Sequence, residues 1–199
     1  MDADGSADGK AGPLARSPDR EAELRPEEVG GGRIPTWNAW YKWAIKQAAN
    51  LRPQVSLVAA KWSNTRRPEA LPGVTAAVAK LRRSSASVIV LGDPPEQFTT
   101  PVDCLLAPDA TMKTCTPRAR KVDLQTDSAV AGMAKRHHAG FINVRGWVCA
   151  CSKARGHPFR CPLAVNRTVT RTDRDHLSCT YPLELARSFR TALRKALFA

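Results

Sequence analysis

Ser87-Val88-Ile89-Val90-Leu91-Gly92-Asp93-Pro94-Pro95 is the stretch that decides the fold. Its short apolar run ends at a Gly-Asp-Pro-Pro turn, as is typical of a strand buried on both faces. Comparable runs occupy residues 54–60 and 140–144. Helical apolar spacing separates and flanks these runs, at residues 36–48, 70–83, 125–138 and 181–197. The alternation predicts an α/β fold, a three-layer open parallel sheet that lacks its first strand.

The chain has one predicted domain and one predicted leader. Residues 1–33 are rich in Gly, Asp, Pro and Ala, show no apolar periodicity and end in Gly30-Gly31-Gly32, which is typical of a disordered leader or linker. Residues 34–199 are long enough for one core, and 43% of the whole chain is apolar. In the first predicted helix the apolar stripe contains Trp40, Tyr41 and Ile45, which we expect to pack in that core.

The net charge of the 199 residues is +13. Because residues 1–33 hold eight acids and five bases, the whole excess lies in the predicted domain, where it suits an anionic glycan, lipid or nucleic acid. The arginines are scattered singly or in pairs, without a basic helix that carries aromatics, so nucleic acid is not the expected partner. No apolar stretch reaches the ~20 residues of a membrane span and no signal peptide is visible, which alone predicts a cytoplasmic chain.

Asp173 and His176 stand three residues apart, directly before the last predicted helix. This is a compact way to build the base half of a hydrolytic triad, in which the carboxylate fixes the tautomer of the imidazole that takes the proton. The spacing alone also fits an exposed acid beside a histidine that caps the helix. Asp175 is the other carboxylate within reach.

A series of motifs resembles a known family. In chain order they are a Trp-containing helix before Leu51-Arg52-Pro53-Gln54-Val55, a strand ending Ala60-Lys61-Trp62-Ser63, the run from Val88 to Pro95, Cys104 with Cys115, Trp147-Val148-Cys149 with Cys161-Pro162, and Asp173-x-x-His176-Leu177-Ser178 before Tyr181. Residues 36–197 thus resemble the SGNH hydrolase domain at the C-terminus of multi-pass membrane acyltransferases that O-acylate cell-envelope glycans. The resemblance implies an SGNH or flavodoxin-like sheet, with His176 as the base and Asp173 as its orienting group.

The nucleophile remains unknown. In that family it is the serine of a Gly-Asp-Ser-His-like block after the first strand, and the 199 residues contain no such block. Gly92-Asp93-Pro94 has proline where the serine is needed. We therefore expect an N-terminally truncated domain that is inactive alone. Asn64 follows a predicted strand near the place of the family's oxyanion-stabilising asparagine, although an asparagine there also fits a turn.

The six cysteines allow two interpretations. The resemblance implies the disulfides Cys104–Cys115 and Cys149–Cys161, each closing a short loop that otherwise has little core. Cys151 and Cys179 then pair with each other or stay as thiols. The alternative is a zinc site formed by Cys149, Cys151, His157 and Cys161, for which Cys-x-Cys is a poor chelate spacing. We expect no metal and no cofactor.

The resemblance implies a serine-ester acyl transfer or hydrolysis on a glycan, with a membrane-embedded acyltransferase domain as partner and a glycan and an acyl donor as substrates. It also implies an extracytoplasmic or membrane-associated location. The alternative function is a non-catalytic accessory domain that holds an anionic glycan or lipid on its positive surface. Neither the acyl donor nor the acceptor follows from the residues.

Overall fold

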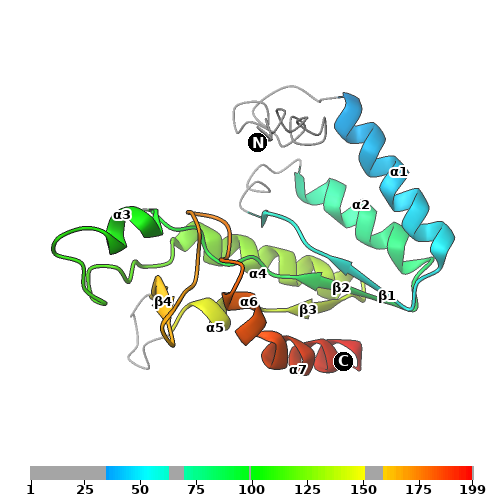
Figure 1. Cartoon of the computed structure of the whole chain (residues 1–199). Helices are drawn as coiled ribbons and strands as arrows, with labels where there is room; N and C mark the ends of the chain where they lie inside the picture. Colours follow the sequence, from blue (N-terminus) through cyan, green and yellow to red (C-terminus); the bar gives the residue numbers. More distant parts are fainter. Residues whose placement is uncertain (1–34, 63–69, 99, 151–158, 199) are drawn as a thin grey trace, which may run out of the picture. The chain divides into compact units, whose positions relative to one another are not determined.

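Figure 1 shows the computed structural model, which describes residues 35–62, 70–98, 100–150 and 159–198. Contacts between residues divide the chain into Met1–Trp43 and Ala44–Ala199. The sheet, its core and the candidate site all belong to the second unit. The leader predicted at residues 1–33 lies outside the described residues.

A parallel sheet forms the centre of the second unit. Its strands are β1 (Val55–Val58), β2 (Ser87–Leu91) and β3 (Gly140–Ile142), in the order β1-β2-β3. Leu57 pairs with Ile89, and Ile89 pairs with Gly140. The three apolar runs are therefore neighbouring parallel strands, which confirms the predicted α/β class with a partial sheet.

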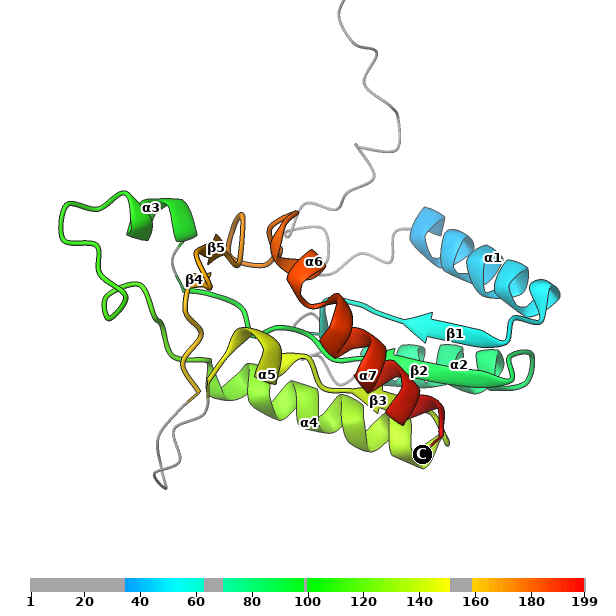
Figure 2. The same ribbon diagram turned by 60° about the horizontal axis from the view of Figure 1, so that its bottom comes forward.

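Helices cover both faces of this sheet (Figures 1 and 2). On one face α2 (Ala70–Arg82) and α4 (Lys121–Arg136) bury a cluster that contains Val88 and Val90 of β2. On the other face α7 (Ala186–Leu197) packs on Ile89. Because successive side chains of a strand point to opposite faces, an uninterrupted apolar run serves both layers.

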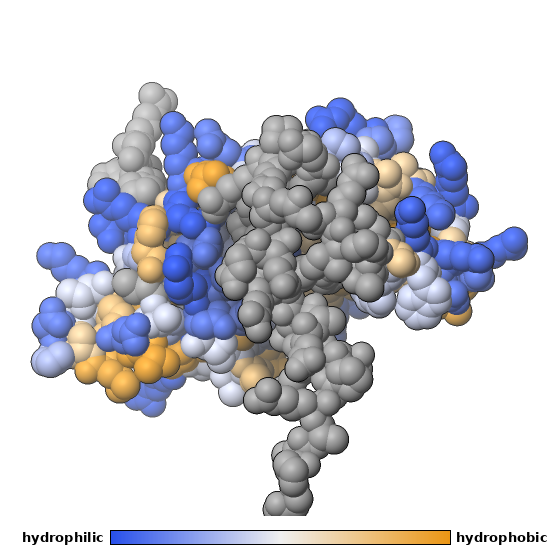
Figure 3. All heavy atoms as spheres, turned by 90° about the horizontal axis from the view of Figure 1, so that it is seen from above, coloured by the Kyte–Doolittle hydropathy of each residue, from blue (hydrophilic) through white to orange (hydrophobic). Residues whose placement is uncertain are grey.

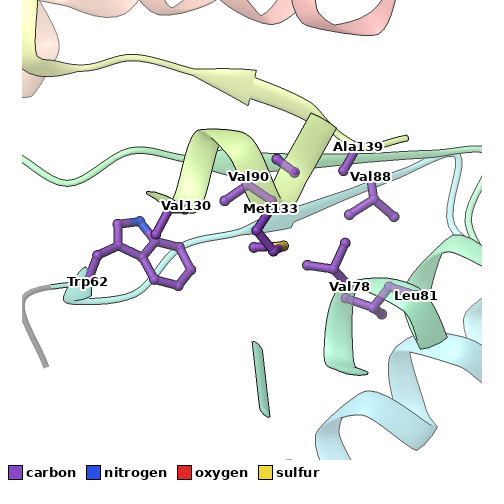
Figure 4. Packing of buried hydrophobic residues seen from close by; sticks show 9 residues of the cluster. Trp62, Val78, Leu81, Val88, Val90, Val130, Met133 and Ala139 are labelled. Atoms are coloured by element: carbon purple, nitrogen blue, oxygen red, sulfur yellow. The ribbon is translucent and has the colours of Figure 1, made fainter. Parts of the chain in front are cut away.

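The larger core cluster lies between β2, α2 and α4. Figure 4 shows Met133 and Val130 of α4 facing the side chains of α2 and β2, with the indole of Trp62 at one end of the cluster. Trp62 is only 1% exposed, and its Nε1–H donates to the carbonyl oxygen of Leu91 over 2.6 Å. The chain after β1 is therefore fixed to the end of β2, which positions the edge of the sheet where the site lies.

Two helices differ from their prediction. In α1 (Pro35–Leu51), Ile45 packs against the larger cluster, but Trp40 and Tyr41 are 53% and 52% exposed, so the predicted apolar stripe is wrong for its first part. The last helix is divided into α6 (Tyr181–Glu184) and α7. Tyr181 is buried and its hydroxyl donates to the carbonyl oxygen of Trp147, which holds the short α6 apart from α7.

The chain between β2 and α4 and the chain after β3 contain short elements and two disulfides. These elements are α3 (Pro101–Leu105), α5 (Arg145–Val148) and the antiparallel pair β4 (Ala164–Val165) and β5 (Thr168–Val169). The disulfides are Cys104–Cys115 and Cys149–Cys161, the two pairings that the resemblance implied. Figure 3 shows hydrophobic side chains gathered at the left-hand end, which holds α3 in Figure 1. Exposed apolar residues of this region are Phe98, Val102, Leu106 and Met112.

Within the described part of the chain, no helix is both long and apolar enough to span a bilayer.

Candidate functional site

The candidate site lies at the edge where the three parallel strands end. Lys61 and Trp62 follow β1, Gly92 and Asp93 follow β2, and the loop of residues 171–178 reaches the same edge from the far end of the sequence. In open parallel sheets, ligands bind at the carboxyl ends of the strands. The fold therefore places the predicted base, His176, and its orienting group, Asp173, at the edge where open parallel sheets bind ligands.

Asp173 and His176 form a direct pair within that loop. The Nδ1 of His176 lies 2.7 Å from Oδ2 of Asp173. The other carboxylate oxygen, Oδ1, accepts the backbone N–H of His176 at 2.8 Å and that of Asp175 at 2.7 Å. One carboxylate thus orders the backbone of the loop and orients the imidazole at the same time. The side chain of His176 is 77% exposed, so its Nε2 edge faces outward.

The same contacts keep Asp173 ionised. Burial is the largest single influence and raises the pKa of this carboxyl, but the two backbone N–H donors and the His176 side chain together outweigh it and lower the pKa from 3.8 to about 2. At neutral pH the group is therefore a carboxylate. A carboxylate that accepts the Nδ1–H leaves Nε2 unprotonated and able to accept a proton, and it stabilises the imidazolium that results.

Asp175 does not compete for the histidine. Its Oδ2 lies 2.6 Å from Nζ of Lys61, the residue that follows β1. The side chain of Arg174 turns the other way, and its Nε–H donates to the carbonyl oxygen of Gln97 at 2.9 Å. The backbone N–H of Gln97 in turn donates to the carbonyl oxygen of Arg174, also at 2.9 Å. The loop is thus held to β1 on one side and to the chain after β2 on the other.

A buried arginine supports the loop from beneath. Arg171 is 1% exposed, and its Nη2 donates to the carbonyl oxygen of Pro95 at 2.7 Å. Its Nη1 lies 3.4 Å from each of the carbonyl oxygens of Arg174 and Asp175. Burial lowers the pKa of this guanidinium, and the nearby carboxylates, that of Asp93 foremost, oppose the shift. Arg171 therefore connects the Gly-Asp-Pro-Pro turn to the loop that holds Asp173 and His176.

The Gly-Asp-Pro-Pro turn has a structural role at this edge. Oδ2 of Asp93 accepts the backbone N–H of Trp62 at 3.0 Å, which joins the ends of β1 and β2. A Cβ on Gly92 would lie 2.7 Å from Oδ1 of Asp127, so only glycine allows α4 to approach this closely. The Gly-Asp-Pro-Pro turn, which resembles the start of a nucleophile block, thus joins the ends of β1 and β2 and supports the loop that holds His176.

A small cavity of about 10 Å³ opens beside this turn. It has room for about one water molecule, too little for an acyl group or a sugar. Asp127 lines it, and its Oδ1 is buried without a hydrogen-bond partner in the part of the chain that the structure describes. Burial raises the pKa of Asp127, although Arg145 and the backbone N–H of Asp93 oppose this. His176 does not line this cavity, and its side chain lies exposed at the edge of the sheet.

The remaining predicted site residues have different outcomes. Asn64 lies outside the described residues, as do Cys151 and His157. The Cys149–Cys161 disulfide removes two thiolates from the zinc alternative, which is therefore not compatible with this structure. Cys179 is an exposed thiol. Sequence reasoning missed the supporting residues Lys61 and Arg171, because nothing in their local sequence marks contacts with partners more than 70 positions away.

Comparison with known proteins agrees with this fold. Residues 18–191 match the family model described as an SGNH domain fused to AT3 domains. A solved structure with the same fold is the periplasmic domain of a lipopolysaccharide acetyltransferase from Salmonella ser. Paratyphi A, at 15% sequence identity and a TM-score of 0.55. The alignment covers 75% of this chain and 61% of that one, so the chain spans less than two thirds of the solved domain. No match was found among curated proteins.

Proposed function

Because this chain belongs to the family of SGNH domains fused to AT3 domains, we propose that it supplies the histidine–aspartate half of a cell-envelope O-acyltransferase site. The observation that carries the proposal is the 2.7 Å contact between Nδ1 of His176 and the Asp173 carboxylate, at the edge of the sheet where the strands end. His176 is the general base and Asp173 orients it. The serine nucleophile comes from outside these 199 residues, since the sequence has no Gly-Asp-Ser-His block.

The proposed reaction has two proton transfers through the same imidazole. Nε2 of His176 takes the proton of the serine hydroxyl as that oxygen attacks the acyl donor, and returns it to the leaving group when the serine ester forms. An acceptor hydroxyl, proposed to belong to a glycan, then gives its proton to Nε2 and takes the acyl group, and the imidazolium returns that proton to the serine oxygen as the serine ester breaks. Throughout, the Asp173 carboxylate holds the Nδ1–H and balances the charge of the imidazolium.

The partner is proposed to be a membrane-embedded acyltransferase domain of the AT3 type, which passes the acyl group to this site. The proposed location is the extracytoplasmic side of the membrane, where the related solved domain is periplasmic. Two disulfides support that location, since disulfides persist in oxidising compartments. Acyl transfer through a serine ester to a hydroxyl group needs no metal. His176 acts as base and acid, and Asp173 orients it.

The first experiment examines the pair in the chain itself. A hydrogen bond between Nδ1–H and a carboxylate gives a far-downfield imidazole N–H signal in the proton NMR spectrum. We expect this signal in the wild-type chain and its loss in Asp173→Asn. Asp175→Asn is the matched control, because Asp175 contacts Lys61 instead of the histidine, and the signal should remain. Loss of the signal in both variants would argue against the assigned pair.

The second experiment supplies the missing nucleophile. The coding region is extended upstream of Met1, and the longer protein is treated with a serine-directed fluorophosphonate and assayed for hydrolysis of 4-nitrophenyl acetate. We expect a labelled serine, a kcat lowered about 10²–10⁴-fold by Asp173→Asn or His176→Gln, and little change with Asp175→Asn. Imidazole in the buffer should partly restore a His176→Gly variant, because the side chain that it replaces is exposed.

One observation favours a second candidate function. Among the described residues, no hydroxyl group forms a hydrogen bond with Nε2 of His176. A non-catalytic accessory domain that binds an anionic glycan or lipid would keep the fold without a nucleophile. If the extended protein folds but neither reacts with the fluorophosphonate nor hydrolyses the ester, the acyltransfer proposal is refuted and the accessory function stands.

A further inference from the structure

Four helix ends meet at the edge of the sheet opposite the candidate site. In Figure 1 the ends of α1, α2, α4 and α7 lie together at the right, and Figure 2 agrees. The backbone N–H of Ala86 donates to the carbonyl oxygen of Pro53 at 3.1 Å, which joins the chain after α1 to the chain after α2. A Cβ on Gly140 would lie 2.7 Å from the carbonyl oxygen of Ala196, which places the end of α7 against the start of β3.

These helix ends carry a concentration of positive charge that we name the basic pole. Its members are Arg52, Lys80, Arg82, Arg83, Lys135, Arg136, Arg194 and Lys195. All are exposed except Arg82, which is half-buried. None of them takes part in an ion pair between described residues. The charge at this edge is therefore presented to the surroundings instead of being neutralised within the fold.

The acids of the domain lie elsewhere. The segments 51–54, 80–87, 134–140 and 194–198, which form this edge, contain neither Asp nor Glu. The acidic residues that the structure describes are Asp93, Glu96, Asp103, Asp109, Asp123, Asp127, Asp173, Asp175 and Glu184. They follow the carboxyl ends of the strands, begin α4 or lie in the region of α3 and α6. Acids and bases are thus mixed elsewhere in the described part of the unit, whereas the basic pole holds cations without acids.

The helix macrodipole accounts for part of this pattern only. Cations in the last turn of a helix are stabilised by about 0.3–1 kcal/mol, which covers residues such as Lys135 and Arg194. It does not explain Arg52 and Arg83, which follow the helices. It also does not explain two large apolar side chains at the same edge, Leu51 at 78% exposure and Phe198 at 88%.

We propose that the basic pole docks on an anionic phospholipid surface, with Leu51 and Phe198 entering the headgroup region. Cations that surround exposed apolar side chains are the combination by which soluble domains bind the membrane interface. A soluble anionic glycan would need the cations but not the exposed Leu51 and Phe198. The proposal is independent of the acyl-transfer site, since it uses none of its residues.

The test uses the 199-residue chain and sedimentation with vesicles. One set of vesicles is phosphatidylcholine alone, and the other contains about one third phosphatidylglycerol. Each Lys or Arg near an anionic surface contributes about 1 kcal/mol, or roughly fivefold in partitioning, so Arg83→Glu/Arg136→Glu/Arg194→Glu should bind on the order of 100-fold more weakly. Lys113→Glu/Arg118→Glu/Lys121→Glu is the matched control, with the same charge change on exposed residues near α3 and the start of α4.

The outcomes separate the proposal from its rivals. We expect binding to the anionic vesicles only, loss with the pole variant, retention with the control variant, and roughly tenfold weaker binding for Leu51→Ala/Phe198→Ala. Equal losses in the two triple variants would show an effect of net charge and overturn the proposal. Binding to soluble anionic polysaccharide or nucleic acid but not to vesicles would also overturn it. Asp173→Asn should bind vesicles like the wild type, so failure here is distinct from failure of the acyl-transfer proposal.

Discussion

Replacement of Gly92 by alanine examines the close contact on which the site's supporting frame depends. The new Cβ would lie 2.7 Å from Oδ1 of Asp127, 3.1 Å from the carbonyl oxygen of Ile142 and 3.1 Å from Cζ of Phe141. The carbonyl oxygen cannot move away freely, because it accepts the backbone N–H of Gly92 at 2.8 Å. Asp127 is 6% exposed and lies 3.8 Å from Nη1 of Arg145, so its rotation is restricted as well.

The expected magnitude follows from two opposing effects. Overpacking of a tight site costs about 1–3 kcal/mol. Alanine also reduces the conformational entropy of the unfolded chain, which offsets about 0.4–1 kcal/mol, because the backbone of Gly92 does not have a positive φ. Gly92→Ala should therefore lower the free energy of unfolding by about 1–2 kcal/mol.

The assay is urea unfolding followed by far-UV circular dichroism. Gly73→Ala is the control, because a Cβ there meets nothing within 4 Å and the residue lies inside α2. That variant should gain about 0.5–1 kcal/mol. If Gly92→Ala is as stable as Gly73→Ala, α4 does not approach the end of β2 this closely. The contacts by which the turn after β2 supports the site would then be wrong as well.

Four further predictions concern the charges, disulfides and core. The stability that ionised Asp173 contributes is fully present above pH 3.8 and is lost as the pH falls toward about 2. Asp173→Asn should therefore flatten the acid side of the curve of unfolding free energy against pH. Identical curves for the variant and the wild type would contradict the lowered pKa. Arg171→Met should destabilise by about 3 kcal/mol at pH 7, because the carboxylates around the guanidinium lose their countercharge; a denaturant titration measures this, and a neutral effect would contradict it. Cys149→Ala/Cys161→Ala should lower the free energy of global unfolding by about 3 kcal/mol, since both residues are buried. Cys104→Ser/Cys115→Ser should mainly speed proteolysis near α3. A larger loss of global stability in the second variant than in the first would contradict this fold. Trp62→Phe should cost about 1–2 kcal/mol by leaving the Leu91 carbonyl oxygen without its donor, and a neutral effect in urea unfolding would refute the importance of that bond.

The local sequence predicted those helices and strands whose bounds follow from hydrophobic periodicity. The boundaries of β2 match the run at residues 87–91, because each of its apolar residues packs in one of the two helical layers. The start of α4 was placed four residues late. Its first turn, from Lys121 to Leu124, alternates charged and apolar residues, and Asp123 pairs with Arg120 just before the helix, so no helical apolar stripe marks it.

The candidate site divides in the same way. The contact between Asp173 and His176 follows from a three-residue spacing within one loop, and the structure contains that contact. Whether the pair is catalytic stays a prediction. The supporting contacts of Arg171 and Lys61 join segments 76 and 114 positions apart, and such pairings become visible only when the order of the strands is known. The exposure of Trp40 and Tyr41 could not be predicted from the sequence either, because helical spacing shows which residues share a face but not whether another element covers that face.

The anchoring of Arg171 has a consequence for how the domain assembles. Its guanidinium meets the Pro95 carbonyl across 76 positions, so this bond gains nothing until β2 and the chain after it are already in place. Closing so long a stretch of chain is slow and entropically unfavourable early in folding. The loop that holds the imidazole should therefore be among the last parts to become ordered and among the first to open, and its backbone amides should exchange with deuterium sooner than those of the strands.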